Sequence, residues 1–344
     1  MKKFLLTLLV IAALIAAFVF YTFSSTGYFH EVNNTESYAV IAEIPMKGAE
    51  DFTINYEDGF MIISQDDRMG RRDGNPSQGH LYYLDLDSGN FEPIQLTTNY
   101  KLPFYPHGIS LLKLDSAHYQ ILVVNHARGH TIEKFELFGN DSLVYMATFR
   151  DESMISPNDV VALDKESFYF TNDHGYTSYW GRLAENYLGL GVSNVVYYDG
   201  RYQEVADGIA YANGINISKD RNQLLVASPR SFKVKYYTIE DGGSLTFDRD
   251  LSVGTGIDNI ELDEEGNLWI GSHPNLLAFA AYAGGKKEKA PSEVIKITNG
   301  DEVESLYEND GSFISASSVA APYKDLLFIG TVMDDRLVVL REKK

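Results

Sequence analysis

The sequence predicts an all-β protein, a six-bladed β-propeller that is preceded by an N-terminal hydrophobic helix and carries a short rim helix. Two observations carry this prediction. A phrase made of a polar opening, an alternating apolar strand, a polar turn and a second apolar strand recurs six times, about fifty residues apart, as propeller repeats do. A further hairpin pattern lies between successive copies, so that each unit amounts to four strands, the content of one blade. The six copies begin at Glu50, His107, Asn158, Asn213, Asp258 and Ser317.

The chain begins with a segment that can cross a membrane. After two lysines, an uninterrupted apolar run extends from Phe4 to Phe20, just long enough to span a bilayer. No clear A-x-A cleavage motif follows it, so residues 1–23 are predicted to be a retained signal anchor, with a cleaved signal peptide as the alternative. Lys2 and Lys3 should stay in the cytoplasm under the positive-inside rule. The large domain then lies outside the cytoplasm, periplasmic or extracellular, or is secreted if the segment is cleaved.

The rest of the chain divides into a tether and one closed domain. Residues 24–45 are predicted to be a polar tether leading into a first strand, and residues 46–344 to form the propeller. One segment, 178–191, lacks strand alternation and places apolar residues at helical spacing, which predicts a surface helix near one mouth of the propeller. Its simplest role is packing on the rim, and the sharper alternative is a lid or a membrane contact.

Composition narrows the function classes. The 344-residue chain has a formal net charge of −19 and contains no cysteine. An acidic chain lacks the basic stripe that binds phosphate, which argues against a nucleic-acid partner. The lack of cysteine excludes disulfides, thiolate nucleophiles and cysteine-based zinc sites. The oligomeric state and the physiological substrate stay open at this point.

Four of the six openings offer oxygen ligands. In a propeller the innermost strand of each blade lines the central channel, so equivalent positions ring the axis at one depth. Carboxylate and amide oxygens gathered there suit a hard cation such as calcium, whereas histidine and cysteine would suit zinc or copper. The alternative is that these Asn and Asp residues cap turns, their commonest use. That alternative weakens over four blades, because a buried ring of unpaired carboxylates is destabilising without a cation. The openings concerned are Glu50-Asp51, Asn158-Asp159, Asn213 and Asp258-Asn259.

Histidines lie at the same level of the repeats. His107 opens the second repeat, and His126 ends the second strand of that repeat, so the two can act as a proton-abstracting pair. Asp173 and His174 occupy the matching strand end of the third repeat, and His273 that of the fifth. For His273 a hydrogen-bonded core role is preferred. His80, His118 and His130 have the pattern of turn or strand-edge residues.

Several short phrases, in order and at similar spacing, resemble the paraoxonase/arylesterase family of calcium-dependent lactonases. Among them are PHGIS, LVVNH, NDVVAL, TNDH, ANGINIS and HPN, and the resemblance extends from about residue 30 to the C-terminus. It implies a catalytic calcium held by Glu50, Asn158, Asn213, Asp258 and Asn259. It also implies a deeper structural calcium held by Asp51, Asp159 and the backbone carbonyl of Ile109.

The resemblance further implies roles for the residues around these ions. His107 and His126 match the family's proposed histidine dyad. Asp173 and His174 match residues near the site mouth, and Tyr211 replaces an aromatic that lines the substrate pocket. Animal members join their termini with a disulfide, so this chain, without cysteine, must close its propeller by strand pairing alone.

The predicted function is carboxylic ester hydrolysis, as an arylesterase or lactonase. Calcium would polarise the carbonyl of a lactone or aryl ester, and His107, assisted by His126, would deprotonate the attacking water. Two alternatives stay open: a gluconolactonase-like sugar lactonase on the same fold, and a non-enzymatic, calcium-stabilised binding propeller tethered to a membrane.

Overall fold

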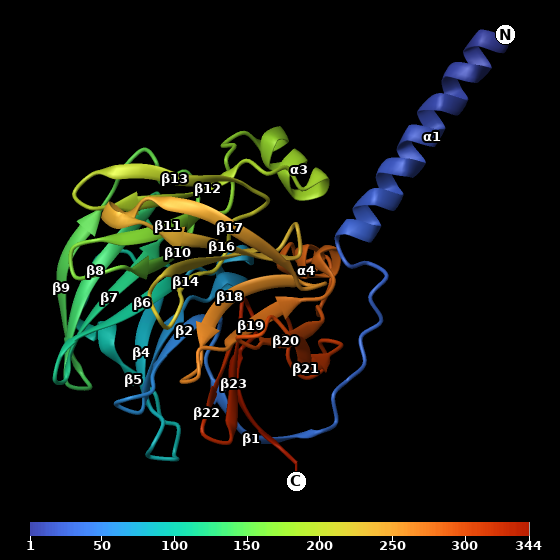
Figure 1. Cartoon of the computed structure of the whole chain (residues 1–344). Helices are drawn as coiled ribbons and strands as arrows, with labels where there is room; N and C mark the ends of the chain where they lie inside the picture. Colours follow the sequence, from blue (N-terminus) through green and yellow to red (C-terminus); the bar gives the residue numbers. More distant parts are fainter. Residues whose placement is uncertain (344) are drawn as a thin grey trace.

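Each of the six repeated phrases forms the first two strands of a four-stranded antiparallel sheet in the computed structural model, which describes residues 1–343 (Figure 1). The first strands of neighbouring blades, β2, β6, β10, β14, β18 and β22, contact one another in a closed ring. The ring confirms the six-bladed β-propeller and places the phrase openings around its axis. Inner and middle strands such as β3 (Phe60–Gln65) and β11 (Phe168–Asn172) are buried at every residue, because neighbouring blades cover both faces of each sheet.

The strands of the first three blades are β2 (Ala49–Asn55), β3 (Phe60–Gln65), β4 (His80–Asp85), β5 (Ile94–Gln95), β6 (Pro106–Asp115), β7 (His118–Asn125), β8 (Thr131–Phe138), β9 (Ser142–Phe149), β10 (Pro157–Ala162), β11 (Phe168–Asn172), β12 (Ser193–Tyr198) and β13 (Tyr202–Ile209). Those of the last three are β14 (Ile215–Ile217), β15 (Gln223–Ser228), β16 (Lys233–Ile239), β17 (Leu245–Ser252), β18 (Gly256–Leu262), β19 (Leu268–His273), β20 (Ser292–Ile297), β21 (Val303–Asn309), β22 (Ser317–Tyr323), β23 (Leu326–Thr331), β24 (Arg336–Glu342) and β1 (Tyr38–Pro45).

The propeller closes by pairing its two ends. Strand β1 lies antiparallel to β24, with Tyr38 opposite Glu342 and Pro45 opposite Arg336. The N-terminal strand is therefore the outer strand of the sixth blade, whose inner strands come from the C-terminus. This confirms closure by strand pairing, and it means that residues before the first repeat belong to the propeller.

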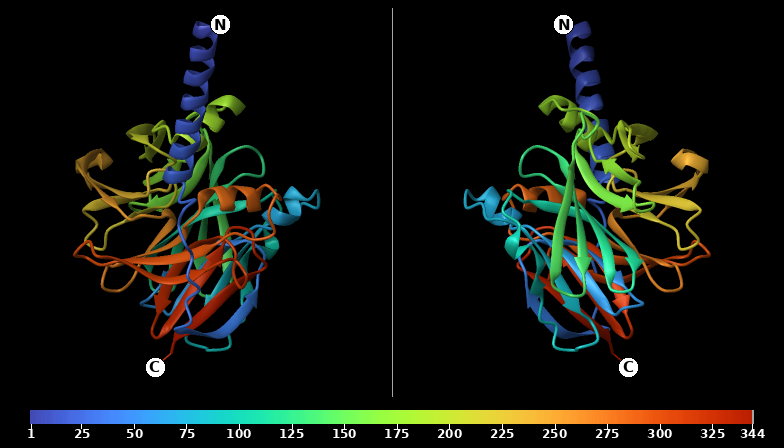
Figure 2. Two further views of the ribbon diagram at one scale, coloured as in Figure 1. Left: turned by 90° about the vertical axis from the view of Figure 1, so that its right-hand side faces the viewer. Right: turned by 90° about the vertical axis from the view of Figure 1, so that its left-hand side faces the viewer.

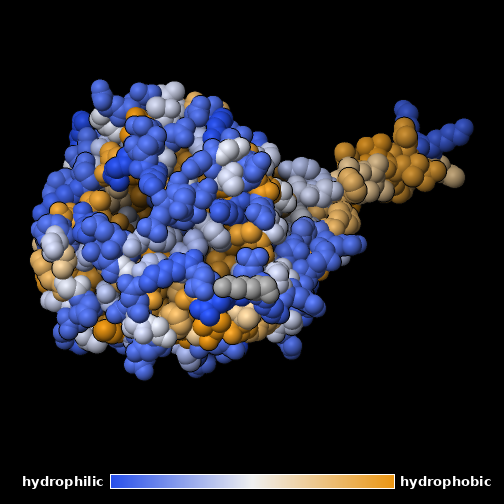
Figure 3. All heavy atoms as spheres, turned by 60° about the horizontal axis from the view of Figure 1, so that its bottom comes forward, coloured by the Kyte–Doolittle hydropathy of each residue, from blue (hydrophilic) through white to orange (hydrophobic). Residues whose placement is uncertain are grey.

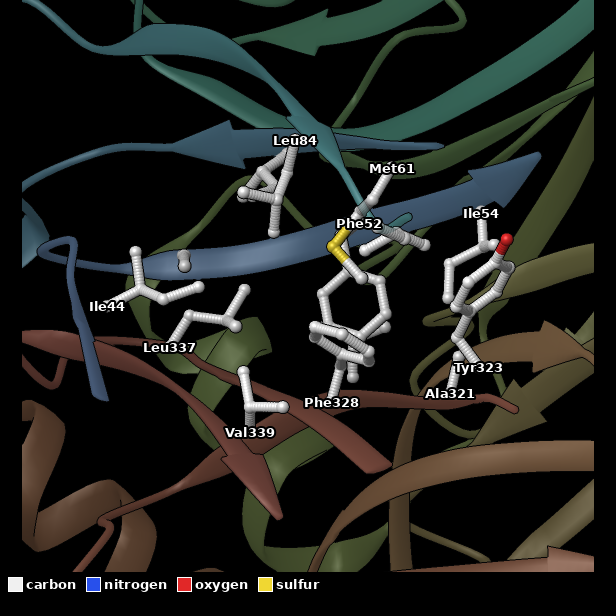
Figure 4. Close-up of a cluster of buried hydrophobic side chains, with 14 of the residues drawn as sticks. Ile44, Phe52, Ile54, Met61, Leu84, Ala321, Tyr323, Phe328, Leu337 and Val339 are labelled. Atoms are coloured by element: carbon white, nitrogen blue, oxygen red, sulfur yellow. The ribbon is translucent and has the colours of Figure 1, made fainter. Parts of the chain in front are cut away.

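Apolar side chains fill the spaces between blades. The cluster between the first and sixth blades, shown in Figure 4, joins Phe52 and Met61 to Phe328 and Val339, all fully buried. Ile44 of β1 packs into the same cluster. The closing strand therefore contributes to the core as well as to the backbone ladder.

The helices lie at one end of the propeller, and the C-terminus lies at the other (Figure 2). Helix α3 (Tyr179–Leu188) confirms the predicted rim helix, with Ser178 as its N-cap and Gly189 in the left-handed conformation at its end. Two further helices were not predicted, α2 (Arg68–Arg72) and α4 (Leu276–Ala283).

Helix α1 (Lys2–Ser25) projects away from the propeller, and its apolar stretch is exposed (Figures 1 and 3). It is the single helix in residues 1–343 long and apolar enough to cross a membrane. Its C-terminal turn docks on the helix-bearing end of the propeller. There the Tyr21 hydroxyl donates to the Leu188 carbonyl at 2.7 Å, and the Arg230 guanidinium donates to the Ser25 carbonyl at 2.7 Å.

Candidate active site

The predicted oxygen ligands converge where the inner strands begin. Glu50, Asn158, Asn213, Asp258 and Asn259 are each at most 6% exposed. The register of the first and second strands shifts near these residues in β2, β10 and β18. Such a bulge inserts an extra residue into the inner strand, which allows two consecutive polar side chains to be buried at the channel. The backbone bulges thus explain why two polar residues stand next to each other at the start of these repeats.

Two glycines let the inner strands approach this closely. A Cβ atom at Gly108 would lie 2.3 Å from Asp159 Oδ1 and 2.7 Å from the Asn158 carbonyl oxygen. A Cβ atom at Gly214 would lie 2.5 Å from the Asp258 carbonyl oxygen. The His-Gly and Asn-Gly pairs that open the second and fourth repeats are therefore required by the narrowness of the ring.

The predicted ligands around the axis form a ring that contains three amides. Each amide nitrogen donates a hydrogen bond, and each amide oxygen accepts none from the described part of the chain. Asn259 Nδ2 donates to Glu50 Oε1 at 3.1 Å, Asn158 Nδ2 donates to Asp173 Oδ2 at 3.4 Å, and Asn213 Nδ2 donates to Asp258 Oδ1. All three Oδ1 atoms are buried and have no hydrogen-bond partner within residues 1–343. A buried acceptor without a partner is costly. Three amide oxygens beside two carboxylates are a donor set that fits a hard cation such as calcium.

The two ring carboxylates are held by opposite influences. Burial raises the pKa of Glu50, but His107 and Arg68 lower it more, so that the net pKa is well below the usual range. Burial raises the pKa of Asp258 overall, although His273, whose Nε2 lies 2.9 Å from Asp258 Oδ2, opposes the shift. Ionisation is therefore favoured at Glu50, whereas burial disfavours it at Asp258.

His107 and His126 are brought together as predicted. His107 Nδ1 lies 2.8 Å from His126 Nε2, and His107 Nε2 lies 3.3 Å from Glu50 Oε1. Burial lowers the pKa of His126 well below its usual value, and His107 and His130 lower it further. His126 is thus neutral near pH 7 and can accept a proton or hydrogen bond from His107.

A second polar cavity of about 100 Å³ lies deeper in the channel and is lined by Asp51, Asp159 and Ile109. The Ile109 amide donates to Asp51 Oδ2 at 2.8 Å, and the Ile215 amide donates to Asp159 Oδ2 at 2.8 Å. Burial raises the pKa of both carboxyls well above the usual range. Two carboxylates buried around one small cavity repel each other when both are ionised. A bound cation would offset that repulsion.

The residues predicted for the site mouth also meet. Asp173 Oδ1 lies 2.7 Å from His174 Nδ1, and the rings of His174 and Tyr211 are 5.0 Å apart, edge to face. Burial raises the pKa of Asp173, but His174 and Ser156 lower it more. Tyr211 adopts a positive φ of 66°, a strained conformation of the kind that gathers at functional sites.

Above the ring is a cavity of about 350 Å³. Its floor is polar, formed by Glu50, His107 and the ring amides, and its walls are apolar. The wall residues come from the rim helices α3 and α4: Leu183, Tyr187, Leu276, Leu277, Phe279 and Ala280. A polar floor beneath apolar walls suits a small ester or lactone whose carbonyl points down.

The sequence did not predict that Arg68, Glu261 and His130 belong to these sites, nor which residue His273 bonds. Arg68 donates to Glu50 Oε2 at 3.3 Å, and Glu261 is a third carboxylate in the deep cavity, with a pKa raised to about 8 by burial. His273 is buried and hydrogen-bonded, as expected, but its partner is the ring residue Asp258 and it lines the upper cavity. His130 packs against His126 and is not simply at a strand edge. For Glu261 a signal existed, since it lies two residues after Asn259 and so on the same face of β18.

The structure thus combines a closed six-bladed propeller with an oxygen-rich floor, a histidine pair and an apolar pocket. The arylesterase family model matches residues 70–339 of this chain. The chain is 35% identical over 305 residues to serum paraoxonase/arylesterase 1 of Homo sapiens, covering 84% of this chain and 85% of the relative. It is 35% identical over 266 residues to serum paraoxonase/arylesterase 2 of Gallus gallus, covering 74% of each.

The chain therefore belongs to the arylesterase family, and it is an ester or lactone hydrolase. Both the predicted family and the predicted enzyme class are confirmed. A gluconolactonase of Xanthomonas campestris has a similar structure, with a TM-score of 0.56, 16% identity and 89% of each chain covered. At that identity the likeness shows the fold alone, so the sugar lactonase alternative is not favoured over the family.

Proposed function

We propose that this protein is a calcium-dependent hydrolase of lactones and aryl esters that works on the floor of the upper cavity. The observation that carries the proposal is the set of three buried amide oxygens without partners, on Asn158, Asn213 and Asn259, beside Glu50 and Asp258. A resident cation would supply positive charge to polarise the substrate carbonyl and stabilise the oxyanion that forms on water attack. The ring residues would hold that ion, and calcium is the ion that the family resemblance implies.

A second ion is proposed for the deep cavity, with a structural role. Asp51, Asp159 and the Ile109 carbonyl would hold it, as the resemblance implies, and Glu261 lines the same space. The inner strands β2, β6 and β10 supply Asp51, Ile109 and Asp159. An ion bound there would tie three blades together at the axis, which is a stabilising role and not a chemical one.

His107 is proposed as the general base. Its Nε2 faces Glu50 and the cavity floor, and its Nδ1 lies 2.8 Å from His126 Nε2. With the proton of His107 on Nδ1, the lone pair of Nε2 would face the cavity floor and could take a proton from an attacking water. His126 thus positions His107, and the neutral amides of the ring leave the bound ion electrophilic. Asp173, His174 and Tyr211 would contact the substrate at the mouth.

The apolar N-terminal helix is proposed as an anchor that holds the propeller outside the cytoplasm. Residues 1–23 would form the anchor, 24–45 the tether and closing strand, and the rest the catalytic domain. The rim helix α3 presents Tyr179, 70% exposed, and Trp180, 78% exposed, at the end of the propeller where α1 docks. Aromatic residues of this kind favour the membrane interface. Fractionation of cells would test the anchor, since a cleaved form would be found in the soluble fraction.

The test is a hydrolysis screen of lactones and aryl esters with the full chain, with calcium and with chelator. We expect turnover only with calcium, and a loss of about 10²-fold or more in Glu50→Gln, which keeps the shape and removes the charge. Glu57→Gln is the matched control, because Glu57 lies in the exposed turn after the same strand. Hydrolysis that persists in chelator, or in Glu50→Gln at the rate of the control, would contradict the proposal.

A further inference from the structure

His130 forms the third member of a row of histidines that starts at the catalytic floor. His126 Nδ1 lies 3.0 Å from His130 Nδ1, and His126 Nε2 lies 2.8 Å from His107 Nδ1. The ring centroids are 5.1 Å apart in both pairs. In His107 and His126, one ring nitrogen points toward the site and the other toward the next histidine. The three rings therefore form a continuous row.

We propose that His130 is the outer member of a three-histidine relay that carries the proton of the attacking water from His107 to solvent. The inference rests on the proposed function, since it extends the role of His107 as base. His130 touches neither substrate nor ion, so it would act as a positioning and proton-accepting residue through His126.

The hydrogen bonds of the row are satisfied by one set of neutral tautomers. His107 carries its proton on Nδ1 and donates to His126, His126 carries its proton on Nδ1 and donates to His130, and His130 carries its proton on Nε2. When His107 Nε2 takes a proton from water, its Nδ1 proton passes to His126 Nε2. The Nδ1 proton of His126 then passes to His130 Nδ1, and the Nε2 proton of His130 leaves to a buffer molecule. One proton enters and one leaves, and no ring gains a lasting charge.

The loop that carries the two outer histidines is held in place. Asn125 Oδ1 accepts from the backbone amides of Tyr105 and Ala127, each at 3.0 Å, and the Thr131 hydroxyl donates to the Asn125 carbonyl at 3.3 Å. These bonds fix both ends of the segment between β7 and β8. These hydrogen bonds therefore hold the loop in the conformation in which His126 and His130 face each other.

The position of His130 suits proton release. It is partly exposed and directly follows the exposed residues Arg128 and Gly129, whereas both ring nitrogens of His126 are taken by other histidines. Burial lowers the pKa of His130, Asp173 raises it, and Arg182, Arg150 and His107 lower it further. His130 is thus neutral at rest and releases an acquired proton readily.

The test measures kcat of the calcium-loaded full chain on phenyl acetate and on a lactone, in dilute and in concentrated buffer. For His130→Ala we expect kcat in dilute buffer to fall about tenfold, less than the ~10²–10⁴ expected for loss of the base itself, with KM unchanged. Added imidazole should restore kcat in a concentration-dependent way, because it can enter the space left by the ring. His130→Gln, which fills the space but cannot pass a proton, should lose kcat equally and be restored less.

Two outcomes would overturn the relay. One is a kcat of His130→Ala equal to that of the wild type in dilute buffer, and the other is a loss that imidazole and buffer do not restore at an unchanged melting temperature. His118→Gln, at the opposite end of β7, is the control and should show no buffer dependence. Failure of the proposed function would look different, because the wild-type protein itself would then hydrolyse neither substrate.

Discussion

Replacing Asp51 by Asn should stabilise the protein in chelator and halve the stabilisation that calcium brings. In the protein without a cation, the Asp51 carboxylate is buried, and its pKa is raised by burial and by the carboxylates of Asp159, Glu50 and Glu261. For an acid, a raised folded-state pKa means that ionisation disfavours folding at neutral pH. Asn removes the charge and can still accept from the Ile109 amide. Relief of the buried charge is expected to raise the stability by about 1–3 kcal/mol in chelator.

With calcium the balance changes. An ion present at about 100 times its Kd adds about 2.7 kcal/mol to the stability of the folded state. At ~2.1 cal/mol/K of unfolding entropy per residue, a propeller of roughly 300 residues gains about 4 °C in Tm per ion. The wild-type chain, with two ions, should therefore gain about 8 °C between chelator and calcium. The Asp51→Asn chain should gain only about 4 °C, because the ring still binds its ion while the deep cavity does not.

Thermal unfolding of both chains in chelator and in excess calcium measures these shifts. The matched control is Asp263→Asn. Asp263 is also buried, 8% exposed against 3% for Asp51, but it accepts hydrogen bonds from the backbone amides of Glu265 and Asn267 and from Trp269 Nε1. That variant should be less stable under both conditions and gain as much from calcium as the wild type. If Asp51→Asn is also less stable in chelator and gains the full calcium shift, the deep cation site is refuted.

Three further predictions follow from other parts of the molecule. His118 lies 3.0 Å from Glu136 and 3.2 Å from Asp115; burial lowers its pKa, but the carboxylates raise it above the usual value. The ion pairs of His118 therefore stabilise the fold below about pH 6.5, and this stabilisation is lost as the pH rises through the folded-state pKa. His118→Gln should lower Tm more at about pH 5.5 than at about pH 9, and an equal loss at both would contradict this. A chain starting at Ser37 should melt cooperatively, whereas one starting at Met46 lacks β1 and should show no cooperative melt by calorimetry; equal Tm values would disprove strand closure. His107→Gln should lower kcat by about 10²–10⁴ without changing the calcium content measured by calorimetry, and an unchanged kcat would exclude it as the base.

Much of the fold could be predicted because periodicity is a local property. The six openings and the alternation that follows them mark the inner strands, and the rim helix is marked by apolar residues at helical spacing. Helix α4 was missed because LLAFAAYA is apolar on all sides, so no periodicity separates it from a buried strand. Helix α2 was also not predicted. Arg71 pairs with the nearby Asp66 at 2.6 Å and stacks over Tyr105, and the packing of the blades creates the second of these contacts.

The site residues that lie at equivalent positions of the repeats could be predicted, and those outside the repeated phrase could not. Equivalent openings in several blades identify Glu50, Asn158 and Asp258 together, since a propeller brings such positions to one depth. Arg68 is the first residue of helix α2 and His130 lies in the loop between β7 and β8, so both lie outside the repeated phrase. Their contacts with Glu50 and His126 depend on the local conformation of these two segments. The spacing of residues in the sequence does not predict that conformation.

The central claim is that the free amide oxygens of Asn158, Asn213 and Asn259 surround a calcium ion beside Glu50. A crystal structure of the full chain grown with calcium tests it most directly, through the anomalous signal of the ion. We expect a peak at the ring with these three oxygens and the carboxylates of Glu50 and Asp258 at about 2.3–2.6 Å. A ring without a peak in calcium-saturated crystals, with the amide oxygens hydrogen-bonded to protein or water, would contradict it.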